Sequence, residues 1–407
     1  MELDQSILLI MLEDLKGAGR DIAREKTMDY QFTDEQLMIR EMVRKLTAEK
    51  VAPRAAEIDE TNEFPEDIKE AYIEHGLLKM GLPEEYGGIE ANVATICMVM
   101  EEISMVSFVA ASLFFSVHLI IDLLFSVGNE EQKKRFFTLL SQGDKMAAMA
   151  VTEPNVGSDL SSMKTRAVLK GDNYIVNGTK CFVSLGSIAD LYGIYVATSP
   201  EKKTKGLSAF IIGRETDGLS IGKIENPMGM RGAAGAEIIF EDVKIPKENL
   251  LGKEGDGFKI LVNSLNVERL WFSSMALGTA QGALDCAARY AKERVQFGRP
   301  IAEFQGIQFM LADMAIQTEV SRSILYEAAA QIDQGIEDNG LKSAVAKCFT
   351  TDSAMRVTAD AVQILGGYGY MKDYPVERMM RDAKATQIAA GTNQIQRVLI
   401  ARSLLSG

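Results

Sequence analysis

The sequence holds few of the residues that build metal sites and disulfide frameworks. Its 407 residues include only four cysteines and two histidines. The cysteines lie far apart and show no C-x-x-C spacing, which argues against disulfides and zinc and fits a reducing compartment. Two histidines cannot supply a multi-histidine centre. We therefore expect neither a disulfide framework nor a metal site.

Positive charge and long apolar runs are also scarce. The formal net charge is -13, and the basic residues are scattered along the chain. This balance argues against nucleic acid or an anionic membrane as the partner. No apolar run is expected to reach the roughly 18–20 residues that span a bilayer. The run that comes nearest, residues 105–121, contains serine and histidine and is predicted to be a buried core helix.

The N-terminus does not have the pattern of a secretory signal. Glu2 and Asp4 occupy the place where such a signal carries basic residues. We therefore predict a cytoplasmic protein without stable membrane insertion. Residues 7–15 have the pattern of a short amphipathic helix. Residues 1–27 are interpreted as an N-terminal extension, which is either a real arm or the product of an upstream start codon.

The chain is long enough for two or three domains, and its pattern changes twice along its length. Residues 28–148 are predicted to form an all-helical domain. Thr33 and Gln36 have the spacing of a capping box at a helix start. Residues 93–127 are almost all apolar and should be buried helices, and residues 130–140 continue the helical pattern.

Residues 149–254 hold short runs of β-forming residues, and we expect a β-barrel or sandwich. Gly171 with Asp172, and Asn177 with Gly178, are predicted to be hairpin turns between strands. The predicted strands are residues 165–169, 173–176, 180–183, 191–197, 209–212 and 236–240. Residues 255–407 return to a helical period. Helices are predicted at residues 258–293, 304–334, 341–365 and 391–405.

Five ordered stretches within about residues 30 to 402 resemble signatures of the acyl-CoA dehydrogenase family. They are residues 150–159, 180–186, 293–305, 363–367 and 387–397. The resemblance implies an α+β fold with an N-terminal helical domain, a middle β-barrel domain and a C-terminal four-helix bundle. It also implies assembly as a homotetramer. The sequence has no G-x-G-x-x-G or P-loop, so we do not expect a Rossmann nucleotide domain.

The resemblance implies FAD as the cofactor and assigns the residues that hold it. A flavin needs hydrogen-bond donors at its polar edge and an apolar wall against its ring. Thr152 and Ser184 would donate, and Phe182 would pack on the ring, although Leu185 replaces the asparagine usual in the family. Arg294 has a planar guanidinium suited to a pyrophosphate, and its element would bind the FAD of a neighbouring subunit. The cofactor-binding residues implied are Met149, Val151, Thr152, Ser158, Phe182, Ser184, Arg294, Phe297, Gln305, Gln363, Gly367, Thr392 and Gln394.

Ala390 stands where most members of the family carry a catalytic glutamate before a Gly-Thr pair. Alanine cannot accept a proton. In the isovaleryl-CoA dehydrogenase branch the base lies on an earlier helix, where this chain has Glu268 before Arg269. Such a pair on a helix is ordinarily solvated, but its neighbours here are apolar, so we predict Glu268 as the base. The substrate-binding residues implied are Ser158, Asn266, Arg269, Ala390 and Gly391.

The predicted reaction is α,β-dehydrogenation of an acyl-CoA thioester, with electrons passing to an electron-transfer flavoprotein. Burial would raise the pKa of the base towards working pH, and the Ala390 N–H would donate to the thioester oxygen. No lysine or arginine occurs from residue 80 to residue 132. Because this stretch borders the acyl pocket by resemblance, we expect an apolar acyl group, and the placement of the base goes in the family with branched or long ones; we favour a medium, branched or ring-bearing group. His118, in the same stretch, is interpreted as a packed core residue.

Three alternatives stay open at this point. An acyl-CoA oxidase of this fold is usually much longer, with an extra C-terminal helical domain. An enoyl-CoA reductase would use the same residues in the opposite direction, because they stabilise one transition state both ways. A non-catalytic flavoprotein that binds acyl-CoA would have Ala390 as the mark of lost activity.

Overall fold

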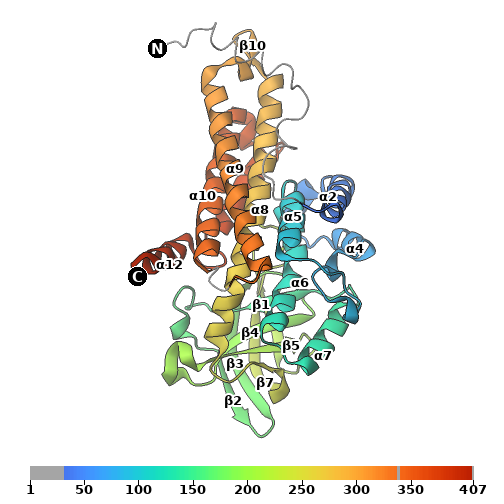
Figure 1. Cartoon of the computed structure of the whole chain (residues 1–407), viewed down its shortest axis with the longest axis vertical. Helices are drawn as coiled ribbons and strands as arrows, with labels where there is room; N and C mark the ends of the chain where they lie inside the picture. The colour runs from blue at the N-terminus through green and yellow to red at the C-terminus, as the bar shows by residue number, and fades with distance from the viewer. Residues whose placement is uncertain (1–31, 337–339, 406–407) are drawn as a thin grey trace.

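The computed structural model describes residues 32–336 and 340–405. The extension at residues 1–27, with its predicted helix at residues 7–15, lies outside these ranges. The described chain forms three parts that follow one another in sequence. Helices come first, a sheet follows, and a tall helical bundle completes the fold (Figure 1).

The N-terminal part is helical, as predicted. Thr33 caps the first helix and forms the expected capping box with Gln36. The helices are α2 (Asp34–Leu46), α3 (Ala55–Thr61), α4 (Glu66–Glu74), α5 (Val93–Ser104), α6 (Phe108–Val127) and α7 (Glu130–Leu140). By length and composition alone α6 could cross a bilayer, so the expectation that no run reaches that length was wrong. Within the protein 83% of its apolar window is buried, which makes it the core helix that was predicted.

The middle part is one eight-stranded sheet. The strands are β1 (Ala147–Ala150), β2 (Arg166–Lys170), β3 (Asn173–Val183), β4 (Leu191–Ala197), β5 (Leu207–Gly213), β6 (Leu219–Ile224), β7 (Ala236–Pro246) and β8 (Leu250–Leu251). Their order is β6-β7-β3-β2-β4-β5-β8, and β1 pairs with β4. Most pairs are antiparallel, but β1 and β2 both run parallel to β4. The sequence prediction missed β1, β6 and β8.

One predicted turn is not a turn. Gly171 and Asp172 do connect β2 to β3, since Lys170 pairs with Asn173. Asn177 and Gly178 instead form a bulge inside the single strand β3, which pairs with β7 on both sides of it. The Asn177 side chain donates to and accepts from Asp242 on β7, at 3.0 and 2.9 Å. The long partner strand therefore overrides the local turn preference.

The C-terminal part is a bundle around α8, which runs without a break for 37 residues. Its other helices are α9 (Gln305–Asp333), α10 (Gly340–Leu365), α11 (Val376–Thr386) and α12 (Asn393–Leu405), and α8 spans Gly257–Glu293. A short hairpin of β9 (Val295–Gln296) and β10 (Arg299–Pro300) lies at the far tip (Figure 1). The helix α11 was not predicted. The last helix begins two residues later than predicted, because Ala390 and Gly391 have left-handed φ of 51° and 80°.

Candidate active site

Glu268 lies in the first third of α8, where this helix crosses α6 and packs against α10. The residue is partly buried, and the next residues along the helix, Arg269 and Leu270, are fully buried. Burial raises the pKa of Glu268 to about 7; Arg269 opposes this shift, Asp122 adds to it, and Lys347 opposes it. A carboxyl with such a pKa is half ionised at neutral pH and can exchange a proton there.

The sequence analysis missed a second carboxyl beside Glu268. Asp122 belongs to α6, and burial raises its pKa to about 7 as well. The hydroxyls of Tyr195 on β4 and Ser264 on α8 are buried next to each other in the same region, where Glu268 and Asp122 act electrostatically on Tyr195. The signal in the sequence was the single charge in the 20 residues of α6. Two carboxyls whose pKa is about 7 therefore lie at the junction of α6, β4 and α8, and each can gain or lose a proton near neutral pH.

The predicted substrate residues next to Glu268 are ordered by one another. The Arg269 guanidinium donates through Nη1 to Asn266 Oδ1 at 2.8 Å, while its Nε has no acceptor in the described chain. Arg269 is only 4% exposed. One helical turn further, Trp271 and Phe272 make edge contacts with Phe115 of α6, with ring centroids 5.8 and 5.1 Å apart. Glu268 therefore has aromatic walls on the neighbouring turn of its helix.

The loop that holds Ala390 is fixed through its carbonyl groups. Gln396 donates to Ala390 O at 3.3 Å and to Gly391 O at 2.8 Å. Lys347 of α10, which is fully buried, donates to Gly391 O at 2.9 Å and to Asn393 Oδ1 at 2.8 Å. Within the described chain the Ala390 N–H makes no hydrogen bond, and this leaves it free to donate to a ligand. Lys347 also acts electrostatically on Glu268, so the loop and Glu268 belong to one region.

Residues 151–158 form a loop that a buried ion pair ties to β3. Lys180 donates to Glu153 Oε1 and to Val151 O, both at 2.9 Å, and the two charged side chains are 0% and 4% exposed. The Cys181 N–H donates to Thr152 O at 2.9 Å. The predicted residues Val151 and Thr152 are therefore rigidly placed, while Ser158 lies on the exposed part of the loop.

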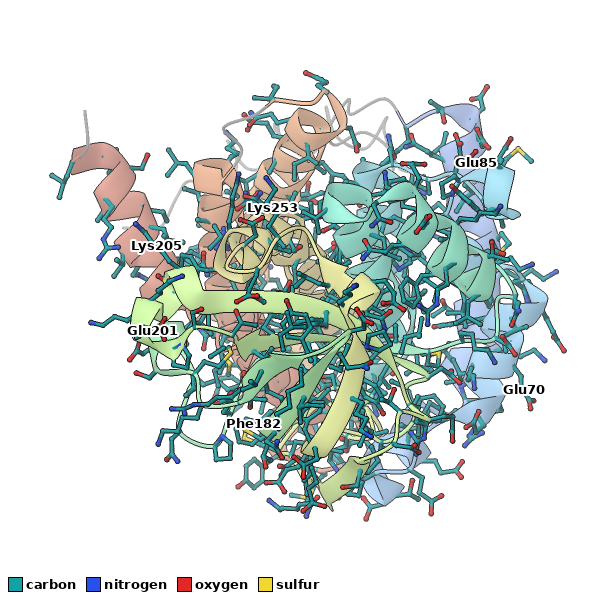
Figure 2. All side chains as sticks on the ribbon, turned by 90° about the horizontal axis from the view of Figure 1, so that it is seen from below. Glu70, Glu85, Phe182, Glu201, Lys205 and Lys253 are labelled. Carbon is teal, nitrogen blue, oxygen red and sulfur yellow. The ribbon has the colours of Figure 1, made fainter. Side chains whose placement is uncertain are left out.

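Phe182 lies near the end of β3, directly after Cys181, which bonds the loop at residues 151–158. It is 69% exposed and has a left-handed φ of 56°, which is unusual for an aromatic residue (Figure 2). Ser184 is exposed beside it, and Leu185 keeps the left-handed turn with φ 57° although it replaces asparagine. Met149 on β1 leans over Gly193, where a Cβ would approach its sulfur to 2.8 Å. An exposed aromatic face beside a donor-bearing turn fits the apolar ring and polar edge of a flavin.

The other predicted cofactor residues gather at the far tip of the bundle. A groove of about 860 Å³ there is lined by Arg294, Phe297 and Gly367, and by aromatic residues that include Tyr368. The Arg294 guanidinium lies 5.6 Å from the Tyr368 ring centroid, and Phe297 is 94% exposed in a hairpin turn. Gln305 begins α9, and Gln363 stands exposed near the end of α10. A cationic groove with aromatic walls fits the adenosine diphosphate part of FAD.

The structure does not bring these two groups of predicted residues together within one chain. Glu268 lies on α8 and Arg294 is the residue directly after its end, so 26 residues of helical rise separate them by about 39 Å. Thr392 and Gln394 stay with the Ala390 loop at the start of α12, where Gln394 is exposed. We therefore do not expect the tip groove and the surroundings of Glu268 in one chain to bind the same ligand molecule.

His118 agrees with the prediction of a packed core residue. It is 2% exposed, and its Nδ1 lies 2.8 Å from Phe114 O. Its ring contacts Phe114 and Trp271, with centroids 4.4 and 5.9 Å apart. Burial lowers the pKa of His118 to about 4, so the imidazole is neutral. No group of three or more metal-ligating side chains occurs in the described residues.

Comparisons with known proteins agree with this arrangement. Residues 33–144, 148–243 and 255–405 match the models of the N-terminal, middle and C-terminal domains of acyl-CoA dehydrogenases. A curated relative, cyclohex-1-ene-1-carbonyl-CoA dehydrogenase of Geobacter metallireducens, is 46% identical over 375 residues, which cover 92% of this chain and 99% of the relative.

Two solved structures share the fold at substantial identity. Butyryl-CoA dehydrogenase of Megasphaera elsdenii superposes with a TM-score of 0.90 at 39% identity, covering 93% of this chain and 100% of the other. A chain in a structure described as the electron transferring flavoprotein of Acidaminococcus fermentans gives a TM-score of 0.90 at 43% identity, with the same coverage. The matched domains are the helical, sheet and bundle parts in order, and this chain therefore belongs to the acyl-CoA dehydrogenase family of flavin-dependent oxidoreductases.

Proposed function

We propose that this chain dehydrogenates an acyl-CoA thioester between its α and β carbons, with Glu268 as the base that takes the α-proton. The observation that carries the proposal is the pKa of Glu268, which burial raises to about 7, in a chain whose residue 390 is alanine. A base whose pKa is near working pH combines adequate basicity with a large ionised fraction. Glu268 lies in the same region as the loop that holds Ala390.

The α-proton of a thioester is weakly acidic, so charge must be stabilised on the thioester oxygen as the proton leaves. The free N–H of Ala390 is the donor we propose for this oxygen. Lys347 and Gln396 hold the carbonyls of Gly391 and Ala390, directly after this N–H, and so restrain the backbone of the loop around it. Losing the glutamate side chain at residue 390 removes a base but keeps this donor.

FAD, when bound, supplies the two-electron oxidant that accepts the β-hydride. In this chain Thr152, Phe182 and Ser184 would hold the ring end, and Thr392 and Gln394 lie on the loop beside it. The groove with Arg294, Phe297, Gln305, Gln363 and Gly367 would hold the nucleotide end of a neighbouring subunit's FAD. The match to a chain from an electron transferring flavoprotein structure supports electron-transfer flavoprotein as the acceptor.

The walls near Glu268 favour a compact, apolar acyl group, and we propose a ring-bearing one. Phe115, Trp271 and Phe272 form a buried aromatic cluster one turn from the base, and a ring-bearing acyl group would pack well beside such a cluster. The relative at 46% identity is named for cyclohex-1-ene-1-carbonyl-CoA, which is a ring-bearing thioester. Medium and branched acyl groups are the other members of the predicted class.

We further propose a homotetramer in the cytoplasm. The helix α9 presents Phe309, Ile316 and Val320, which are 60%, 60% and 43% exposed. Their spacing of seven and four residues puts them on one face, as in a helix that packs against another. A tetramer would also place the tip groove of one chain beside the ring site of another, which the 39 Å spacing estimated above requires (about 26 residues at 1.5 Å).

Anaerobic bleaching of the bound flavin by a panel of acyl-CoAs tests the proposal. The panel should hold straight, branched, cyclic, aromatic and dicarboxylic thioesters, and we expect the cyclic class to bleach fastest. Glu268→Gln should slow bleaching at least a hundredfold, whereas Glu201→Gln, at an exposed site, should not (Figure 2). Bleaching that survives Glu268→Gln but not Asp122→Asn would transfer the role of base to Asp122.

Two remaining alternatives give different results in the same experiment. A chain that binds acyl-CoA without any bleaching across the panel would be a non-catalytic flavoprotein, with Ala390 as the decisive residue. An enoyl-CoA reductase would show slow bleaching by saturated thioesters and fast reoxidation of the dithionite-reduced flavin by the matching enoyl-CoA.

A further inference from the structure

The segment between β6 and β7 is wedged between the N-terminal helices and the bundle. We call residues 225–235 the wedge loop. Met230, Gly232 and Ala234 in it have left-handed φ of 56°, 95° and 46°. A Cβ on Gly229 would come within 2.5 Å of the Arg381 carbonyl oxygen, and one on Gly232 within 2.4 Å of an Ile58 methyl. The loop therefore touches α11 on one side and α3 on the other, with no room for larger residues.

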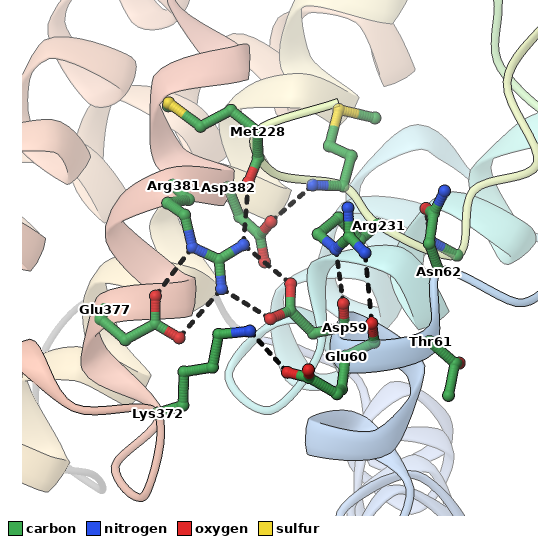
Figure 3. A network of polar contacts seen from close by, with 12 residues as sticks. Asp59, Glu60, Thr61, Asn62, Met228, Arg231, Lys372, Glu377, Arg381 and Asp382 are labelled. Carbon is green, nitrogen blue, oxygen red and sulfur yellow. Dashed lines mark hydrogen bonds and ion pairs between the residues drawn. The ribbon is translucent and has the colours of Figure 1, made fainter. Parts of the chain in front are cut away.

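On the α11 side, two neighbouring residues hold the wedge loop (Figure 3). The Asp382 carboxylate accepts the N–H of Met230 at 2.6 Å and is 4% exposed. Arg381 donates to Met228 O at 2.8 Å and pairs with both carboxylate oxygens of Asp59 on α3, at 2.8 and 2.6 Å. These bonds join α11, a helix of the bundle, to the wedge loop and to α3 of the N-terminal helical part.

On the α3 side the wedge loop is held as well. Arg231 donates through Nε to Asp59 O at 2.5 Å, and the Gly232 N–H donates to Asn62 Oδ1 at 2.8 Å. The ion pair of Glu60 with Lys372 lies at the exposed rim of the same cluster (Figure 3). The loop is thus fixed at both flanks before it returns to the sheet.

The far end of the wedge loop grips the turn that follows Phe182. Ala233 O accepts the Leu185 N–H at 2.8 Å, and Ala234 O accepts the Ser187 N–H at 3.2 Å and the Ser187 hydroxyl at 2.9 Å. Phe182 and Leu185 both have left-handed φ, so this turn is strained and needs outside bonds to keep its shape. The wedge loop supplies three of them.

The C-terminal end of α11 leads to the loop that holds Ala390. We call this loop the second wall of the site, and the turn after Phe182 the first. The helix ends at Thr386, and Ala390 follows four residues later. One helix is therefore connected to the turn after Phe182 through Asp382 and the wedge loop, and its own C-terminus leads to the proposed oxyanion donor. The two walls of the site otherwise belong to different domains, the sheet and the bundle.

We propose that Asp382 is a positioning residue that sets the turn of Phe182 and Ser184 against the Ala390 loop, through the wedge loop. This rests on the proposed function, because it assigns a purpose to the alignment of those two walls. We do not propose any contact of Asp382 with substrate or cofactor. It acts through the Met230 N–H and the carbonyls of Ala233 and Ala234.

The test compares three variants of the FAD-loaded enzyme with the wild type. Asp382→Ala removes the acceptor for the Met230 N–H, and Asp382→Asn keeps an acceptor oxygen of the same reach. Glu60→Gln breaks the exposed ion pair of the cluster and serves as the control. A fourth variant, Ser187→Ala, removes one bond at the opposite end of the wedge loop and covers the case in which Asp382→Ala fails to fold.

We expect Asp382→Ala to lower the rate of flavin reduction at least tenfold while the Kd for acyl-CoA changes less than threefold. The visible circular dichroism of bound FAD should change, and amide hydrogen exchange of residues 183–187 should quicken. Asp382→Asn should restore the rate to within threefold of wild type, Ser187→Ala should change the same readouts to a smaller extent, and Glu60→Gln should change none.

An Asp382→Ala protein with normal dichroism, normal exchange at residues 183–187 and a normal rate would overturn the proposal. So would equal losses in Asp382→Ala and Asp382→Asn that appear only as lower thermal stability. If no acyl-CoA reduces the wild type, the proposed function fails, but dichroism and exchange still decide whether Asp382 positions the turn.

Discussion

Replacing Glu268 with glutamine should change how the stability of this enzyme depends on pH. Burial raises the pKa of Glu268 from the ordinary 4.5 to about 7 in the folded chain. Folding therefore favours the protonated carboxyl, and the ionised form destabilises the native state above the ordinary pKa. Glutamine cannot ionise, so the variant should gain stability relative to wild type as the pH rises from about 4.5 to about 7, with no further gain above that.

The size of the effect follows from the two pKa values. Linkage predicts that the stability gap between Glu268→Gln and wild type widens by about 2 kcal/mol from about pH 5.5 to about pH 8. Any fixed cost of the new amide is the same at every pH and cancels from this change. Over a similar range, about pH 6 to about pH 8, the wild-type rate of flavin reduction should rise about tenfold as the base ionises.

Both quantities can be measured on the same preparations. Thermal unfolding at fixed protein and FAD concentration gives the gap, which should grow by a few degrees, and anaerobic stopped-flow spectroscopy gives the rate. Asp122→Asn tests the neighbouring acid, and Glu201→Gln controls for the loss of a surface carboxylate. A gap that stays flat with pH would show that Glu268 is ionised as easily as in water, and the reasoning from burial would fail.

Three further predictions concern the groups that hold the site. Lys347→Met should slow flavin reduction about tenfold with little change in acyl-CoA affinity, because the Gly391 carbonyl keeps only one of its two donors, Gln396; an unchanged rate in stopped-flow traces would contradict this. Lys180→Met should cost about 3–5 kcal/mol by stranding the buried Glu153 charge, and adding Glu153→Gln should recover part of it in thermal unfolding; equal melting temperatures for the single and double variants would refute the ion-pair argument. Arg294→Lys should weaken FAD retention, because lysine keeps the charge but loses the planar fork; equilibrium dialysis measures this, and unchanged retention would remove Arg294 from the cofactor site.

The sequence predicted the elements that have long and regular patterns. The limits of β4 and α7 were obtained as they stand, and α8 begins within one residue of the expected position. The short, highly charged α11 was missed because only a narrow face of it is apolar, around Val376, Met379 and Ala383. Asn177 and Gly178 have strong turn preference, but pairing with the long strand β7 keeps them within β3.

For the site, the sequence indicated which residues take part, but not which of them lie close together in the fold. Glu268 was predicted from the resemblance to the isovaleryl-CoA dehydrogenase branch, supported by its apolar surroundings and by the alanine at residue 390. Asp122 could not be connected with it, because their proximity depends on how α6 crosses α8, about 146 residues further along. Asp382 was not singled out either, since its partner is a backbone N–H of Met230 that no side-chain pattern reveals.

Because α8 is unbroken, the number of its residues fixes the distance between Glu268 and Arg294. One inserted residue anywhere between Glu268 and Arg294 would advance the far end by about 1.5 Å and rotate it by about 100°. Even seven inserted residues, which nearly restore the facing, would displace the tip by about 10 Å. Natural variation along this stretch should therefore exchange side chains, within the limits that packing sets for its buried face, but should not insert or delete residues. Any relative that keeps both residues in these roles must keep the number of residues between them.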